Sequence, residues 1–177
     1  DRTTAVFRKA ARLHAARGYR DLEQVAYLHQ PTQRQVLEVI EESLPVVITG
    51  LEPVPPCRDW TLDRLAQTYG DEVVRVRSAT PSQTMTAFVE ELKAYQANPY
   101  DDLIEGFVKP YTEGAQLPQA MLPDFGPLFF DREDFIAPQL WLGAVPTHIP
   151  TSSLHRDPLT GFLLQVIGRK TLELYSA

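Results

Sequence analysis

The hydrophobic pattern of the chain changes at Pro45, and this change limits the available folds more than any other feature. Residues 1–44 repeat apolar side chains at helical spacing, which predicts a helix at 3–18, a shorter one at 21–30 and a further one at 31–44. The run PVVITGL, which begins at Pro45, is rich in β-branched side chains and predicts a buried strand. We therefore expect an α+β fold, with an N-terminal helical region at 1–44 and a second domain at 45–177.

Two segments early in the second domain carry clear signals for regular structure. Residues 60–70 predict a short helix that starts after an N-cap, Thr61, and stops at Gly70. Residues 71–79 alternate apolar and charged side chains, which predicts a strand with one buried and one exposed face.

The rest of the second domain is less regular. Residues 81–99 predict an amphipathic helix, and residues 138–146 predict an apolar strand. Between them, residues 99–136 are rich in aromatics and prolines, which predicts short turns whose aromatic side chains pack on a core. Residues 162–176 predict two antiparallel strands joined by the turn GRK.

Composition describes a globular protein and argues against two kinds of partner. The chain has 177 residues, and its 15 prolines are spread along it rather than gathered into a disordered tract. The net charge is −6 and no stretch is strongly basic, so we expect no nucleic-acid partner. No apolar run approaches the roughly 20 residues that span a bilayer, so we expect no membrane partner.

The single cysteine and the start of the chain bear on the possible metal site and on the cellular location. One cysteine excludes a disulfide framework and a cysteine-based zinc site within a single chain. We expect Cys57 to be a partly buried or surface thiol, because no nearby residue in the sequence could activate it. The first residues lack the apolar core of a signal peptide, so the expected location is cytoplasmic.

The motif SSLHRD could supply half of a metal site. On an extended chain His155 and Asp157 point to the same side, so an imidazole and a carboxylate could reach one ion. With a second histidine they would complete the facial triad of non-haem iron oxygenases. A surface turn between two strands is the other interpretation of these residues.

Four segments in order resemble the JmjC and cupin-like hydroxylases. The first is LPVVITGL followed by WTLDRLAQTYGDEVVRV, the second is LWLG, the third is SSLHRD and the fourth is QVIGRKTLELYS. The resemblance covers residues 45–177 and implies a double-stranded β-helix, the cupin or jelly-roll fold.

This resemblance implies an oxygenase that depends on iron(II) and 2-oxoglutarate. His155 and Asp157 would bind the iron, while Lys170, fifteen residues after His155, would bind the distal carboxylate of 2-oxoglutarate with help from the Ser152 hydroxyl. A buried carboxylate needs such a cation, although a lysine in water at a hairpin turn is the other interpretation of Lys170. The implied reaction is hydroxylation of a protein or peptide side chain, or of a small molecule, with oxidative decarboxylation of 2-oxoglutarate to succinate.

The sequence departs from the family pattern at the third metal ligand. That ligand is a histidine several strands later in the family, whereas this sequence ends twenty-two residues after His155. The other histidines, His14, His29 and His148, all lie upstream, and none is expected to bind the metal. We therefore expect the barrel to be incomplete in this chain, which would then be part of a longer protein.

Two alternatives to the oxygenase stay open. A catalytically inactive cupin-like binding or scaffold protein would lack the full metal triad. A cupin isomerase or dioxygenase that does not use 2-oxoglutarate would keep the metal and have no use for Lys170. A homodimer is one of the assemblies that the sequence leaves open.

Overall fold

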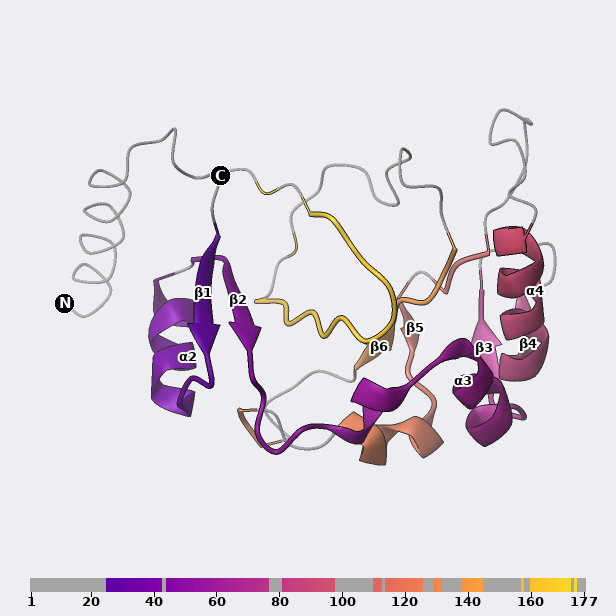
Figure 1. Cartoon of the computed structure of the whole chain (residues 1–177), viewed down its shortest axis with the longest axis horizontal. Helices are drawn as coiled ribbons and strands as arrows, with labels where there is room; N and C mark the ends of the chain where they lie inside the picture. The colour runs from indigo at the N-terminus through magenta and orange to yellow at the C-terminus, as the bar shows by residue number, and fades with distance from the viewer. Residues whose placement is uncertain are drawn as a thin grey trace. The chain divides into compact units, whose positions relative to one another are not determined.

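The computed structural model combines short helices with short strands. It describes residues 25–42, 44–76, 81–97, 110–112, 114–125, 129–131, 138–144, 157, 160–172 and 174. The elements in chain order (Figure 1) are β1 (Ala26–His29), α2 (Gln33–Glu41), β2 (Val46–Thr49), η1 (Pro56–Asp59), α3 (Leu62–Tyr69), β3 (Val73–Arg75), β4 (Ser82–Thr84), α4 (Met85–Ala97), β5 (Ala115–Gln116), η2 (Gln119–Phe125) and β6 (Gln139–Leu140). The predicted mixture of helices and strands is confirmed. The described residues form three two-stranded sheets, β1–β2, β3–β4 and β5–β6, and none of these closes into a barrel.

The described residues group into two compact units. The first unit draws on Asp1–Pro55 and Pro127–Asp134, and the second on Pro56–Gly126 and Phe135–Ala177. The expected boundary after residue 44 stays a prediction of the sequence. The predicted helix at 3–18 lies outside the described residues.

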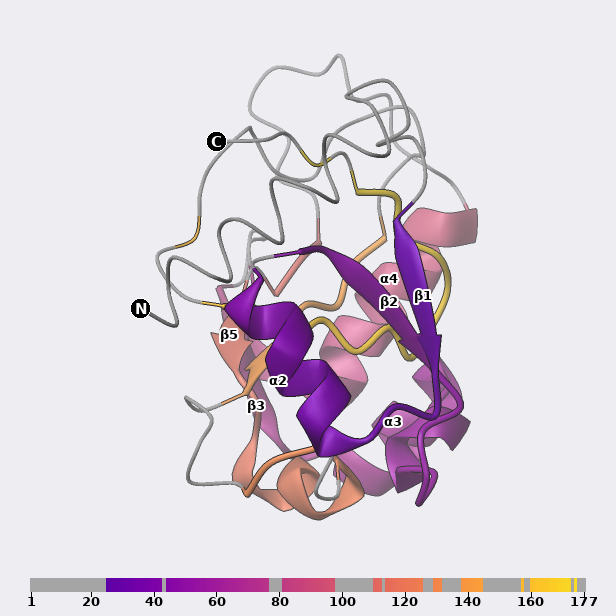
Figure 2. The same ribbon diagram turned by 90° about the vertical axis from the view of Figure 1, so that its left-hand side faces the viewer.

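The first unit is built on a parallel strand pair. β1 and β2 pair in parallel with Ala26 opposite Val46, and α2 makes the connection that parallel strands require. Figure 2 shows α2 beside the two strands. The prediction of a helix at 21–30 is therefore wrong for Ala26–His29, because pairing with β2 overrides the local helical spacing.

The other two predictions for this unit are confirmed in part. α2 forms inside the predicted range and begins with a capping box, in which the Thr32 hydroxyl accepts from the Gln35 N–H and the Gln35 side chain accepts from the Thr32 N–H. β2 forms as predicted, but it is not buried on both faces. Its residues alternate, with Val47 exposed, because a two-stranded sheet leaves one face of each strand uncovered.

The second unit packs helix α3 against helix α4, and the predicted ends of α3 are confirmed. The Thr61 hydroxyl accepts a 3.1 Å hydrogen bond from the Arg64 N–H, and Gly70 caps the other end. Gly70 has an ordinary helical φ of −56°, so the glycine is not needed for its backbone conformation. It is needed for space, since an added Cβ would lie 2.5 Å from the Thr86 hydroxyl of α4.

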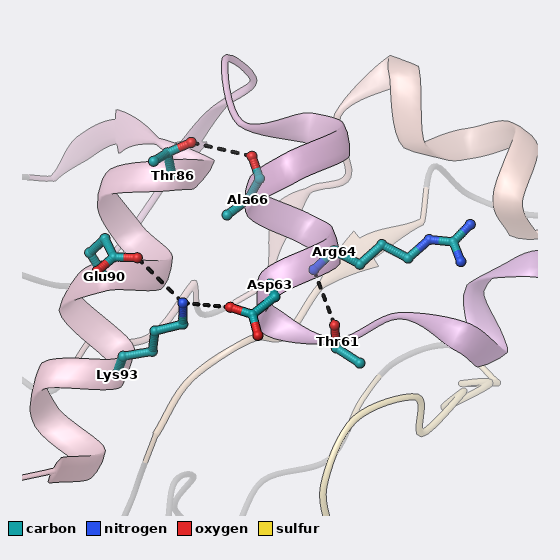
Figure 3. A network of polar contacts seen from close by, with 7 residues as sticks. All are labelled: Thr61, Asp63, Arg64, Ala66, Thr86, Glu90 and Lys93. Carbon is teal, nitrogen blue, oxygen red and sulfur yellow. Dashed lines mark hydrogen bonds and ion pairs between the residues drawn. The ribbon is translucent and has the colours of Figure 1, made fainter.

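Polar contacts connect the two helices across their exposed side (Figure 3). Lys93 of α4 pairs with Asp63 of α3 at 2.6 Å and with Glu90 at 3.4 Å. Because Asp63 is 71% exposed, this pair adds little to stability, and the apolar residues of α4 dominate the packing. Phe88 and Val89, for example, are fully buried.

An antiparallel pair, β3–β4, lies next to α4 in the second unit. β3 confirms the predicted alternation, since Val74 is buried and Arg75 is exposed. The predicted helix at 81–99 begins later than expected, because Ser82–Thr84 pairs with β3 as a strand. The Thr84 hydroxyl then accepts from the Ala87 N–H and so caps the start of α4.

These elements enclose one hydrophobic core in the second unit. Its buried residues are Cys57, Trp60, Leu65, Tyr69, Val74, Val76, Met85, Phe88, Val89, Leu92, Tyr95, Leu117, Met121, Leu140 and Ala144. Part of the predicted strand at 138–146 forms as β6, which pairs with β5. The aromatic residue Phe125 of η2 packs edge-on against Trp60 at 5.4 Å, as expected for the loop region 99–136.

The predicted strand pair at 162–176 is not formed by the described residues of that stretch. The chain bends at Ile167 and Gly168, where Gly168 has a φ of +73° that suits a turn, but no ladder follows. A two-stranded hairpin is marginally stable in water, and here Leu164 and Val166 pack on the core of the second unit instead.

Candidate functional site

The structure places two of the four residues predicted to form the site. Asp157 and Lys170 are both exposed, and each lies in the second unit. His155 and Ser152 lie outside the described residues. The predicted convergence of these side chains on one hollow therefore stays a prediction.

Lys170 does not simply extend into solvent. Its Nζ lies 5.5 Å from the ring centroid of Trp141, within the range of a cation–π interaction. Trp141 belongs to the LWLG motif directly after β6 and is 44% exposed. Among the residues that the structure describes, no carboxylate forms an ion pair with Lys170. The ammonium is thus ordered by an aromatic ring and keeps its capacity to bind an anion.

Two neighbours fix the position of Trp141. The ring of Tyr111 lies 6.1 Å away, tilted by 54°, and Tyr111 is itself 7% exposed. Gly114 approaches so closely that an added Cβ would lie 2.8 Å from the indole Cζ2. Gly114 also has a φ of +71°, a conformation that favours glycine. The indole therefore packs against a buried aromatic ring and a backbone turn.

The backbone around Trp141 is held by one buried side chain. The Thr112 hydroxyl donates to the Leu140 carbonyl at 2.6 Å and accepts from the Leu142 N–H at 2.8 Å. The Thr112 N–H also donates to the Leu142 carbonyl at 2.9 Å. Because Thr112 is 3% exposed, these bonds are shielded from competing water. Both residues that flank Trp141 are thereby fixed.

The second unit also holds a polar network that the sequence analysis missed. One oxygen of Asp124 accepts hydrogen bonds from Trp60 Nε1 at 2.8 Å and from the Tyr69 hydroxyl at 2.6 Å. The bond from Tyr69 is the largest influence that lowers the pKa of Asp124 below its ordinary value. Burial, and then the bond to Asp124, raise the pKa of Tyr69 to about 12. Asp124 is more than fifty residues from both donors, so no short sequence motif could have predicted the network.

Cys57 is fully buried beside this network, which corrects the prediction of a partly buried or surface thiol. Burial in the core raises the pKa of its thiol, and the Asp124 carboxylate raises it further. A thiol with a raised pKa and no exposure is unreactive. Cys57 therefore belongs to the core and not to the site.

The described residues also bear on metal and membrane sites. That part of the chain contains no group of three or more His, Cys, Asp or Glu side chains arranged to hold a metal ion. His29 is exposed on β1 with Nδ1 3.1 Å from the Thr49 hydroxyl, and it is a strand residue rather than the helical one predicted. No helix among the described residues has both the length and the apolar character needed to cross a membrane.

A cavity of about 260 Å³ lies in the first unit, where the carboxyl ends of β1 and β2 meet. It is lined by Gln30, Pro31, Gln33, Gly50, Leu51, Glu52 and Phe129. None of the predicted site residues lines it.

Comparison with known proteins identifies the family. The profile of the family described as Cupin-like domain matches residues 31–177, which is well over half of the chain. The chain belongs to this family, so the resemblance drawn from the four motifs is confirmed at the level of the family.

Three curated relatives are similar over most of the chain. Lysine-specific demethylase 8 of Danio rerio is 27% identical over 168 residues, covering 87% of this chain and 40% of the relative. Lysine-specific demethylase 8 of Xenopus tropicalis is 28% identical over 143 residues, covering 75% and 31%. The tRNA wybutosine-synthesizing protein 5 of Gallus gallus is 25% identical over 171 residues, covering 81% and 52%. The chain thus spans about a third to a half of the length of these relatives. No solved structure matches the chain significantly.

Proposed function

We propose that this chain forms part of an oxygenase that depends on iron(II) and 2-oxoglutarate and hydroxylates a side chain of a protein or peptide. The observation that carries the proposal is the family match over residues 31–177, which includes the whole stretch SSLHRDPLTGFLLQVIGRK. Lysine-specific demethylase 8 and the wybutosine-synthesizing protein are similar to 87% and 81% of this chain.

Lys170 has the chemistry that the co-substrate requires. 2-Oxoglutarate has a distal carboxylate that needs a cation when it leaves water. Lys170 presents an exposed ammonium whose described neighbour is an aromatic ring, so it can accept that carboxylate without first breaking an ion pair to a described residue. Lys170 would hold the carboxylate, and the Ser152 hydroxyl would add a hydrogen bond.

His155 and Asp157 would hold the metal. Asp157 is exposed in the structure. An imidazole and a carboxylate are the donors that iron(II) takes in the facial triad. When bound, iron and 2-oxoglutarate would activate dioxygen, which is the oxidant for the hydroxylation, and the protein would hold and orient the reactants.

A protein or peptide substrate is favoured over a nucleic acid by the charge of the chain. The name of one relative refers to tRNA and the names of the other two refer to lysine. The net charge of this chain is −6 and no stretch is strongly basic, whereas nucleic-acid binding relies on clustered cations.

The test is conversion of 2-oxoglutarate to succinate by the full-length protein, supplied with iron(II) and ascorbate. We expect Lys170→Ala to raise the KM for 2-oxoglutarate about tenfold or more, because it removes the cation that pairs with the distal carboxylate. Lys93→Ala is the matched control, since Lys93 is a half-buried lysine that pairs with Asp63 on α3. We expect its KM to equal that of the wild type.

Two outcomes would contradict the proposal. If the protein with iron(II) never consumes 2-oxoglutarate, the inactive cupin-like binding protein becomes the better description. If consumption is unchanged in Lys170→Ala, the assignment of Lys170 as the carboxylate anchor is wrong.

A further inference from the structure

We propose that Trp141 is a positioning residue for Lys170, holding the ammonium where it meets the distal carboxylate of 2-oxoglutarate. This inference rests on the proposed function, since it assigns a partner to the residue that would anchor the co-substrate. It is carried by the 5.5 Å approach of Lys170 Nζ to the Trp141 ring.

The need for such a partner follows from the chemistry of lysine. Its ammonium ends a flexible four-carbon stem, and the stem loses rotamer entropy when the ammonium binds a ligand. A contact that already restricts the stem removes part of this loss before the ligand arrives. The exposed aromatic face of Trp141 provides such a contact without neutralising the charge, which a carboxylate partner would do.

The indole is itself fixed, so it can hold the ammonium of Lys170 in one place. Tyr111 and the turn at Gly114 limit its movement, and the Thr112 hydroxyl fixes the backbone on both sides of it. Those contacts join the LWLG motif to residues 111–114, and the contact between Lys170 and Trp141 joins it to the segment 160–172. Two motifs that are separate in the sequence therefore act as one structural unit.

The experiment measures ligand binding rather than turnover. The full-length protein loaded with Mn(II), which does not support the redox reaction, is titrated with 2-oxoglutarate by calorimetry. A parallel titration uses 2-oxobutyrate, which keeps the keto-acid end and lacks the distal carboxylate. The variants are Trp141→Leu, Trp141→Phe, Lys170→Ala and the double variant Trp141→Leu with Lys170→Ala.

We expect Trp141→Leu to weaken 2-oxoglutarate binding about two- to fivefold, the range of an exposed cation–π contact. Trp141→Phe should retain most of the affinity, because it keeps an aromatic face. Binding of 2-oxobutyrate should be the same in all variants. In the Lys170→Ala background the substitution of Trp141 should have no further effect, since two residues that act through one contact are not additive.

Three results would overturn the inference and leave the proposed function intact. The first is unchanged or tighter 2-oxoglutarate binding in Trp141→Leu. The second is a loss of affinity for 2-oxobutyrate in Trp141→Leu that equals the loss for 2-oxoglutarate. The third is an additive loss of 2-oxoglutarate affinity in the double variant. If Lys170→Ala binds 2-oxoglutarate as the wild type does, the anchor role falls and the inference falls with it. If circular dichroism shows that Trp141→Leu is unfolded, Trp141→Met, which keeps a long side chain without an aromatic face, decides by the same comparison of the two ligands: a loss of affinity of about two- to fivefold for 2-oxoglutarate alone supports the inference, and unchanged affinity or an equal loss for both ligands overturns it.

Discussion

The carboxylate of Asp124 gives a sharp test of how the second unit is held together. One of its oxygens accepts from Trp60 and from Tyr69, and these two donors are only 5% and 8% exposed. Replacing Asp124 with Ala leaves both donors without this acceptor. Replacing it with Asn keeps an oxygen at the same place but removes the charge.

The magnitude follows from these contacts. An unpaired buried donor costs about 1–3 kcal/mol, and the partial exposure of Asp124 lets water replace some of what is lost. We therefore expect Asp124→Ala to lower the free energy of unfolding by about 2–4 kcal/mol. Charge-assisted hydrogen bonds are roughly twice as strong as neutral ones, so Asp124→Asn should cost about 1–2 kcal/mol.

The assay is urea denaturation followed by circular dichroism, with Asp63→Asn as the matched control. Asp63 is also a carboxylate with a 2.6 Å partner, but it is 71% exposed, so its loss should cost about 0–1 kcal/mol. If Asp124→Ala costs no more than Asp63→Asn, with equal denaturant dependence, the network around Asp124 does not stabilise the fold.

The pH dependence of the same variants has a defined sign. The pKa of Asp124 is lowered in the folded state, so its contribution is present above its ordinary value of 3.8 and is lost as the pH falls through the lower folded value. The difference in stability between wild type and Asp124→Asn should therefore shrink on acidification below about pH 4. A difference that grows in acid would contradict this assignment.

Three further predictions concern single contacts, each measured by urea denaturation. Thr112→Val keeps the shape but removes the hydroxyl between Leu140 and Leu142, and should cost about 1–3 kcal/mol; a cost within error of zero would refute its bridging role. Thr61→Ala should cost about 1 kcal/mol by uncapping α3, and Thr61→Ser should restore most of it; equal costs for both would refute the cap. The pKa of Tyr69 is raised from 10.0 to about 12, so its contribution is present below about pH 10 and lost as the pH rises through 12. Tyr69→Phe should therefore lose less stability than the wild type above about pH 10, and parallel losses would contradict the raised pKa.

Elements with local signals could be predicted from the sequence. The predicted start and end of α3, at Thr61 and Gly70, are confirmed, because a cap acts on backbone groups within a single turn. The alternation in β3 was correct for the same kind of reason, since neighbouring side chains on a strand point to opposite faces. Both signals lie within a few residues of the structure that they specify.

Predictions were wrong where the local structure depends on a partner that is distant in the sequence. Ala26–His29 has helical spacing but forms a strand, because β2 is its hydrogen-bonding partner. Ser82–Thr84 was assigned to a helix and instead pairs with β3. Cys57 was expected near the surface and is buried, because Trp60 and Met121 belong to the same core cluster.

By itself the sequence determined the family and predicted the candidate site residues, because the order of the motifs from LPVVITGL to QVIGRKTLELYS is visible without coordinates. The roles of His155, Asp157, Ser152 and Lys170 remain predictions from that order. Only the tertiary structure decided that Lys170 rests on Trp141 and that Asp124 joins Trp60 and Tyr69. Spacing in the chain reports on neighbours within a turn or a strand, whereas these contacts exist only after the folded backbone brings distant segments together.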